Sequence, residues 1–240
     1  LRFLVALFCG IGSGIGGLAF LMHYLLMHQL QLTFSVFSGL IVGSGVLVAR
    51  SVQNRNVPTM VAFLVGITVA WGVVGLDALQ NPPDALWYLF LCGAVGICAM
   101  ILPGISGAFI LLILGRYDYV TGLVRGVLSG DLTLDTLTAV AVFGCGCVTG
   151  LLTTSRGLRW LLSHHHDLTL ATLCGFMIGS LRRIWPFKHD LTPNETEFKL
   201  KEFVNVFPDS LDGTTLLTIA LAVGALIALL GLEAISRRRS

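Results

Sequence analysis

Long stretches without a charged side chain alternate with short polar segments along the 240-residue chain. No Lys, Arg, Asp or Glu lies between Arg2 and Arg50. Five further gaps run from Arg55 to Asp77, Asp84 to Arg116, Asp135 to Arg156, Asp167 to Arg182 and Asp212 to Glu233. A helix that crosses a bilayer needs about 20 mainly apolar residues. The pattern therefore predicts membrane helices at residues 3–26, 32–49, 59–79, 134–155, 168–183 and 214–235.

Composition agrees with this pattern and excludes two classes of protein. Only 12% of the residues are charged and 55% are hydrophobic, whereas an average soluble domain carries about 25% charged residues. We therefore predict an all-α, polytopic membrane protein rather than a soluble enzyme or a nucleic-acid-binding protein. The net charge of +2 indicates no special partner. The six cysteines lie in apolar stretches without a CxxC pair, so we expect neither disulfides nor a metal site, and no cofactor.

One apolar run is too long to be a single membrane helix. Residues 86–115 would extend roughly 45 Å as one helix at 1.5 Å per residue, against a hydrocarbon core of about 30 Å. The run contains the segment Pro103-Gly104-Ile105-Ser106-Gly107. Proline lacks a backbone N–H and glycine frees the turn. We expect a break there, which makes the run a helix hairpin or a re-entrant pair.

The sequence contains an internal repeat. Segment 8–46 aligns with segment 144–182 without a gap, at a constant shift of 136 in the numbering, and 11 of the 39 positions are identical. The next helices match at a shift of 156, because a polar loop at 184–213 lengthens the second copy. We assign residues 1–80 to a first repeat and 81–240 to a second. The identical pairs are Cys9/Cys145, Gly10/Gly146, Gly14/Gly150, Leu25/Leu161, Leu26/Leu162, His28/His164, Leu32/Leu168, Thr33/Thr169, Gly39/Gly175, Gly43/Gly179 and Ser44/Ser180.

The repeat predicts an inverted topology. One complete unit consists of a broken hairpin and three spans, so it crosses the membrane an odd number of times and the next copy is inverted. Inverted repeats are typical of secondary transporters, whose substrate site lies near the bilayer midplane. The repeat partner of Pro103 would precede residue 1, so we expect a first broken hairpin that this chain lacks. Basic residues divide almost evenly between the two sides, and the carboxyl terminus is placed inside by a small margin.

The break is the strongest candidate for chemistry. A half-helix that starts at Ser106 would present the N–H groups of Ile105, Ser106 and Gly107 within the membrane, where they would bind a phosphate or a carboxylate. Irregular backbone at membrane depth occurs only where it is buried in protein or lines a cavity. The structural alternative is an ordinary proline kink with Ser106 bonded back to a carbonyl.

The segment Ile-Leu-Pro-Gly-Ile-Ser-Gly, followed by Phe-Ile-Leu-Leu-Ile-Leu-Gly-Arg-Tyr-Asp, resembles the second motif of the bacterial undecaprenyl-phosphate translocases. The segments 39–44 and 175–180 also look like that family, and the resemblance covers most of the chain except 185–212. Ala108 stands where the family usually has Ser, and the family's first Pro-Gly motif is absent. The resemblance implies return of the carrier lipid phosphate to the inner leaflet of the bacterial cytoplasmic membrane for cell-envelope polysaccharide synthesis.

On that resemblance, Pro103, Gly104, Ser106 and Gly107 shape the headgroup site and Arg116 is a candidate phosphate partner. An intramembrane Arg is costly and usually functional. The alternative is that Arg116 lies at a helix end beside Asp118.

Other polar residues near the ends of the predicted spans are further candidates for the site. Tyr117 is either part of the substrate site or an interfacial anchor. Arg182 and Arg183 end a span and either bind the headgroup or anchor the helix. Asp77 and Glu233 occupy matching repeat positions and are candidates for carrying coupling protons. The tract His164-His165-His166 is expected to be a solvated turn rather than a metal site.

Three other functions remain to be weighed. Gly104-Ile105-Ser106-Gly107 matches the GxSG pattern of an intramembrane serine protease, but only His23 lies within a span and no second catalytic residue accompanies it. A lipid-phosphate phosphatase would need clustered His, Arg and Lys residues that the spans do not offer. A transporter or channel for a small anion would also use the broken helix. The expected partners are a polyprenyl phosphate lipid, the bilayer and a second copy in a homodimer.

Overall fold

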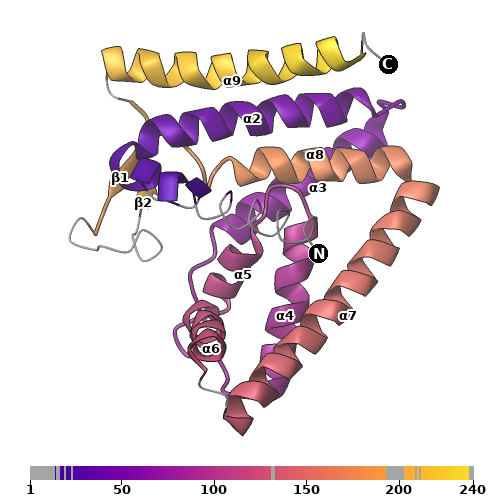
Figure 1. The fold of residues 1–240 in the computed structure, drawn as a ribbon. Helices are drawn as coiled ribbons and strands as arrows, with labels where there is room; N and C mark the ends of the chain where they lie inside the picture. The colour runs from indigo at the N-terminus through magenta and orange to yellow at the C-terminus, as the bar shows by residue number, and fades with distance from the viewer. Residues whose placement is uncertain are drawn as a thin grey trace, which may run out of the picture. The chain divides into compact units, whose positions relative to one another are not determined.

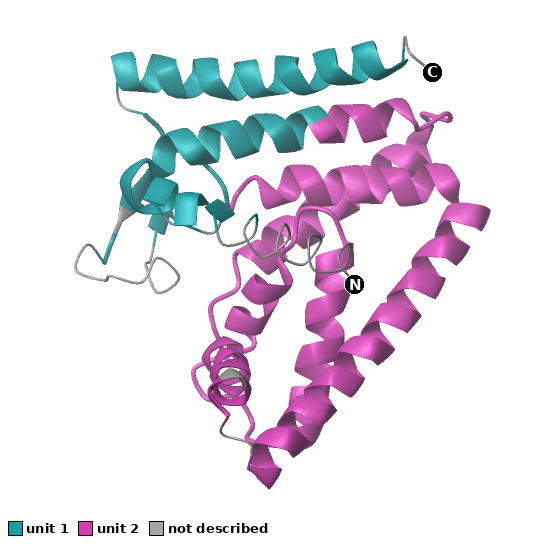
Figure 2. Cartoon of the chain, in the orientation of Figure 1, with its two compact units in different colours: residues 1–43, 184–240 teal, residues 44–183 magenta. Residues whose placement is uncertain are grey.

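The computed structural model describes residues 14, 17–18, 20–22, 24–130, 133–192, 203–208, 210 and 212–237. Its elements form two compact units, residues 1–43 with 184–240 and residues 44–183 (Figures 1 and 2). The elements are α2 (Leu30–Arg50), α3 (Val57–Val74), α4 (Leu86–Ile101), α5 (Gly107–Ile113), α6 (Tyr117–Ser129), α7 (Leu134–His164), α8 (His166–Ser180), β1 (Lys188–Asp190), β2 (Phe203–Asn205) and α9 (Gly213–Arg237).

Helices α3 and α8 pack against each other within the unit 44–183. The Asn56 side chain caps α3 by accepting a hydrogen bond from Thr59 N at 3.2 Å. Glycines then allow the two backbones to approach closely. A Cβ atom on Gly66 would collide with the carbonyl oxygen of Thr172, and one on Gly175 would collide with that of Phe63. Small residues at such contacts are typical of helix pairs in membranes.

Helices α4 and α7 form the second pair of this unit, again through glycines. A Cβ atom on Gly93 would meet the Phe143 carbonyl, and one on Gly146 or Gly150 would meet the backbone of α4. Side chains of α4, α5, α6 and α7 form an apolar core in this unit. Its members are Leu89, Val120 and Ala139, with Leu111, Leu123 and Phe143 packed around them.

The unit formed by 1–43 and 184–240 contains α9, the first part of α2 and a short hairpin. Gly39 faces the backbone of Ala222 in α9, and Gln31 donates a hydrogen bond to Thr218 Oγ1 at 2.9 Å. Strands β1 and β2 pair antiparallel with His189 opposite Val204. The hairpin is a feature that the sequence did not predict, since the segment 184–213 was expected only to be a polar loop.

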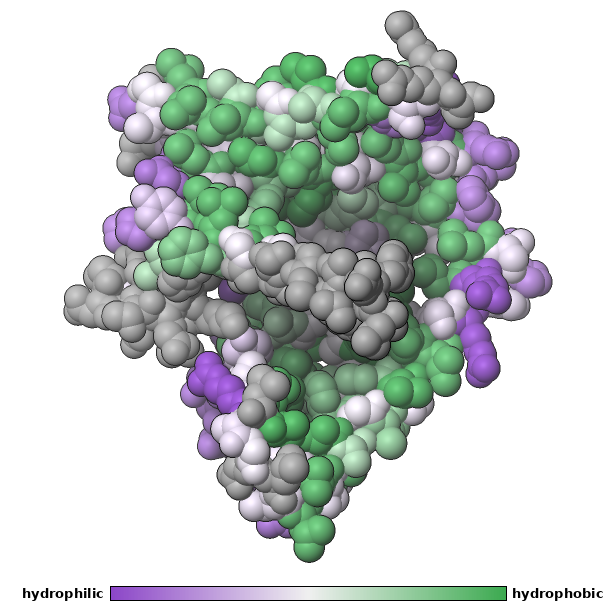
Figure 3. All heavy atoms as spheres, viewed as in Figure 1, coloured by the Kyte–Doolittle hydropathy of each residue, from purple (hydrophilic) through white to green (hydrophobic). Residues whose placement is uncertain are grey.

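Four helices of the described residues are long and apolar enough to cross a membrane: α2, α3, α7 and α9. Apolar side chains cover the visible faces of the long helices, and hydrophilic residues gather near their ends (Figure 3). The chain is therefore a predominantly helical, multi-pass membrane protein. Most of the predicted first span, 3–26, lies outside the described residues, and so does His23.

Two predicted spans end earlier than the sequence suggested. Helix α3 ends at Val74 rather than residue 79, because the chain leaves the helix at Gly75. Helix α8 ends at Ser180 rather than residue 183, and its 15 residues extend roughly 22 Å, less than the thickness of a hydrocarbon core. Helix α7, in contrast, continues to His164 instead of ending at residue 155.

The break in residues 86–115 is confirmed. Helix α4 ends at Ile101 and α5 begins at Gly107. A second bend follows, since α6 turns 118° away from α5. The sequence did not predict this second bend, and it limits α5 to seven residues.

Candidate functional site

The break between α4 and α5 rests on the end of α8. Gly104 has a φ of +95°, a conformation that favours glycine. A Cβ atom at this position would lie 2.6 Å from Ser180 Oγ. Ser180 is buried, and its hydroxyl donates to the Met177 carbonyl at 2.7 Å. The turn at Gly104 therefore packs directly against the Ser180 side chain, whose hydroxyl already has a hydrogen-bond partner.

The opposite side of the break is open. Gly104, Ser106 and Ala108 are exposed. Ser106 is the N-cap residue of α5, and its side chain makes no capping hydrogen bond. No His in the described part of the chain hydrogen-bonds to Ser106, and a serine protease would require such a base.

The two arginines that follow α8 have different partners. The Arg182 guanidinium lies 5.1 Å from the centre of the Trp71 ring and donates to the Trp71 carbonyl at 3.0 Å. The Arg183 guanidinium lies 4.5 Å from the centre of the Phe109 ring, in the first turn of α5. Because Phe109 lies in α5, this contact puts the Arg183 cation beside the break. Arg183 is also exposed.

Arg116 is not at the break but at the second bend. Its side chain is 9% exposed and donates to the Pro83 carbonyl at 2.5 Å and to the Asp84 carboxylate. The Tyr119 ring lies 5.1 Å from the guanidinium. The acidic partner is thus Asp84, whereas the sequence pointed to Asp118.

Further contacts fasten the second bend to α4 and to the segment before it. Gly115 has a φ of +65°, and a Cβ atom there would collide with the Leu79 carbonyl. Leu79 N donates to the Ile113 carbonyl at 2.8 Å, and the Tyr88 hydroxyl donates to the Leu114 carbonyl at 2.8 Å. Together with the Arg116 contacts, these bonds fix where α6 begins.

The remaining predicted site residues lie apart from the break along the chain. Tyr117 is a half-buried residue at the start of α6. Asp77 is exposed in the loop after α3. Glu233 lies in α9, where its carboxylate pairs with Arg237 Nε at 2.5 Å.

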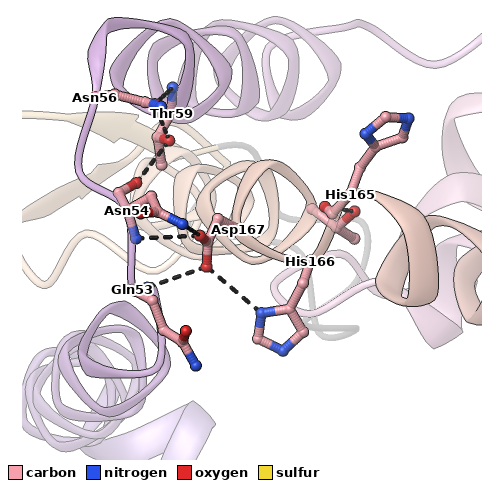
Figure 4. Close-up of polar contacts among 8 residues, drawn as sticks. Gln53, Asn54, Asn56, Thr59, His165, His166 and Asp167 are labelled. Atoms are coloured by element: carbon pink, nitrogen blue, oxygen red, sulfur yellow. Dashed lines mark hydrogen bonds and ion pairs between the residues drawn. The ribbon is translucent and has the colours of Figure 1, made fainter.

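Sequence reasoning missed a carboxylate that joins α8 to the α2–α3 loop (Figure 4). Asp167 Oδ1 accepts from Gln53 N at 3.0 Å, and Oδ2 accepts from Asn54 N at 3.1 Å and from Asn54 Nδ2 at 2.8 Å. These bonds, that from Gln53 first, lower the pKa of the Asp167 carboxyl from 3.8 to about 2. The only signal in the sequence was an acidic residue in the first turn of a helix.

Fold and site together define a multi-pass helical membrane protein with a break between α4 and α5 and a cation beside that break. A family model described as undecaprenyl phosphate translocase-like matches residues 1–201, so the chain belongs to that family. The chain is 40% identical over 190 residues to a polyprenyl-phosphate transporter of Vibrio cholerae serotype O1, which covers 79% of the chain and 59% of the relative. It is 28% identical over 196 residues to a polyprenyl-phosphate transporter of Staphylococcus aureus, covering 77% and 68%.

The chain thus spans 59% of the length of the Vibrio relative. No solved structure matches the chain.

Proposed function

We propose that the protein transports polyprenyl phosphate across the bacterial cytoplasmic membrane, from the outer to the inner leaflet, for reuse in cell-envelope polysaccharide synthesis. The phosphate headgroup binds at the break, while the polyprenyl tail stays in lipid. The names of both relatives support the substrate. A transporter of this kind needs a polar passage for the headgroup alone, because the tail is already soluble in the bilayer.

The observation that carries the headgroup site is the position of Arg183. Its guanidinium lies over Phe109, three positions after the exposed Ser106. No carboxylate of the described residues pairs with it. A planar guanidinium binds phosphate through two parallel hydrogen bonds. In this arrangement Pro103, Ile105 and Gly107 shape the turn and Arg183 supplies the charge.

The role of Arg116 follows from its partners. A carboxylate and a carbonyl already bind its guanidinium, so we assign it to holding the second bend rather than to contacting phosphate. Arg182 is likewise occupied by Trp71 and fastens α8 to α3. Tyr117 is kept as an interfacial residue, and proton coupling through Asp77 or Glu233 stays a prediction, as does the homodimer.

An inverted duplication is part of the proposal, and matched contacts support it. Gly39 contacts Ala222, and Gly175 contacts Gly66. Gly39 and Gly175 are related by the shift of 136, whereas Gly66 and Ala222 are related by the shift of 156. Gly43 approaches Leu226, and Gly179 approaches Ala70. Again the two glycines are related by the shift of 136 and their partners by the shift of 156. These matched contacts support the duplication.

The helix junctions match as well. Thr33 Oγ1 donates to the Gln29 carbonyl at 2.8 Å, and Thr169 Oγ1 donates to the His165 carbonyl at 2.8 Å. Both pairs are related by the shift of 136. The odd number of spans in a unit then favours opposite orientations for the two copies, as in secondary transporters.

The test compares binding of polyprenyl phosphate with binding of the corresponding polyprenol by the purified protein. The wild type should prefer the phosphate, and Arg183→Gln should lose this preference by roughly tenfold or more, as expected for a charge-assisted contact. Arg182→Gln and Arg116→Gln are matched controls that should keep the preference.

Equal binding of both lipids by the wild type would contradict the proposal and favour the small-anion transporter. If Arg183→Gln kept the preference for polyprenyl phosphate over polyprenol, the headgroup would not bind at Arg183.

A further inference from the structure

Two ring stacks occupy equivalent positions of the repeat. The Tyr24 and His28 rings are stacked with centroids 4.5 Å apart at an interplanar angle of 22°. The Trp160 and His164 rings are stacked with centroids 5.0 Å apart at 25°. The repeat shift of 136 converts the first pair into the second. The aromatic residue has changed from Tyr to Trp, but the geometry of the stack is the same.

The hydrogen bonds of the two imidazoles also match. His28 Nδ1 lies 3.0 Å from the Tyr24 carbonyl oxygen, and His164 Nδ1 lies 3.0 Å from the Trp160 carbonyl oxygen. His164 Nδ1 also lies 2.8 Å from Ser163 Oγ. A carbonyl only accepts, so an Nδ1 that bonds to one carries the proton. No described residue hydrogen-bonds to Nε2 of either ring. Each stack thus fixes one nitrogen and leaves the other for a ligand.

Both stacks are accessible. Tyr24 is 53% exposed and Trp160 is 55% exposed, and both histidines are exposed. An imidazolium has a second N–H, at Nε2, which donates to an anionic oxygen.

The course of the chain assigns the stacks to opposite membrane surfaces. The first stack immediately precedes α2. In the inverted topology proposed above, α2 and α3 cross the membrane and return, the broken hairpin adds no net crossing, and α7 crosses once more. The second stack, at the end of α7, is therefore on the other side from the first.

We infer that the two stacks are paired surface sites for a lipid phosphate monoester, one at each face of the membrane, where the headgroup binds before and after it passes the break. This inference rests on the proposed function. A Tyr or Trp alone suffices as an interfacial anchor, so anchoring accounts for neither the stacked imidazole nor its free Nε2. A monoester presents three oxygens to the Nε2–H at an accessible surface.

The experiment uses the double variant His28→Gln/His164→Gln in vesicles of phosphatidylethanolamine, with His189→Gln as the control for loss of an exposed histidine elsewhere. Glutamine keeps a polar side chain but cannot become a cation. Three probes are titrated: polyprenyl phosphate, polyprenol and phosphatidylglycerol, which is a phosphodiester. We expect the double variant to bind polyprenyl phosphate at least threefold more weakly, with the other two probes and the control unchanged.

Two results would overturn the inference. An equal loss for polyprenol or phosphatidylglycerol would show that the stacks only anchor the helices. Unchanged polyprenyl phosphate binding would show that they do not contact the headgroup. Both results leave the preference lost in Arg183→Gln intact, so failure of the surface sites is distinguishable from failure of the proposed function.

Discussion

Gly104 is the residue on which the shape of the break depends most directly. Its positive φ and its contact with Ser180 both exclude a side chain. Proline and glycine act through their own backbones, so the sequence sufficed to locate this break. Asp84 and Arg116 are different, because they are far apart in the sequence and meet only through the second bend. No local pattern predicts such a pair.

Replacing Gly104 with Ala should destabilise the protein by about 2–5 kcal/mol. A left-handed conformation costs an L-residue about 1–2 kcal/mol, and overpacking costs about 1–3 kcal/mol. Thermal unfolding in detergent measures the loss. Gly122→Ala is the matched control, since a Cβ atom on Gly122 meets nothing within 4 Å. Equal unfolding temperatures for the two variants would contradict the assigned contact with Ser180.

Arg116 and Asp84 should contribute unequally although they form one ion pair. The Arg116 side chain is 9% exposed and that of Asp84 is 93% exposed. Arg116→Gln breaks the bonds to both Pro83 and Asp84, and we expect a loss of about 1–3 kcal/mol. Asp84→Asn keeps the Pro83 bond and replaces an exposed charge, so its loss should stay below about 1 kcal/mol. The reverse order in denaturant unfolding would show that the carboxylate, not the carbonyl, fixes the bend.

At the scale of elements, the sequence predicted where helices lie better than where they end. Hydropathy located α2, α3, α7 and α9, because burial of apolar side chains in lipid depends on composition over a long window. The end of α8 depends instead on the turn at residues 181–184, where the chain leaves the helix at Arg182 and Arg183. The polar composition of residues 184–213 likewise did not predict β1 and β2, because these strands pair through backbone groups that every residue carries.

The Asp167 joint between α8 and the α2–α3 loop predicts a specific pH dependence. Its pKa is lowered from 3.8 to about 2 in the folded protein, so the folded state favours the carboxylate. The stabilisation is complete above pH 4 and is lost as the pH falls toward 2. Asp167→Asn should therefore be less stable than the wild type at pH 6, and the difference should shrink on acidification.

Unfolding temperatures between pH 6 and pH 2.5 measure this difference, with the exposed Asp77→Asn as the control. A difference between wild type and Asp167→Asn that stays constant down to pH 2.5 would exclude the carboxylate as its source.

At the scale of the whole molecule, the duplication makes a prediction about sidedness. Gln29 and His165 are equivalent positions of the repeat and directly precede α2 and α8, respectively. In a cysteine-free background, Gln29→Cys and His165→Cys should react with a membrane-impermeant maleimide from opposite sides of oriented vesicles. Ser51→Cys, at the end of α2, should react from the same side as His165→Cys. Labelling of Gln29→Cys and His165→Cys from one side would rule out inverted copies.

The adjacent residues Arg182 and Arg183 tie the end of α8 to two different helices. Arg182 is fastened to Trp71 in α3 by a hydrogen bond and a ring contact, whereas Arg183 touches α5 only through the face of Phe109. In the proposed function, a phosphate that binds Arg183 competes with the Phe109 ring contact alone, whereas the Arg182 hydrogen bond to Trp71 is unaffected. Headgroup binding would then loosen the contact between α8 and α5 and leave the contact between α8 and α3 in place.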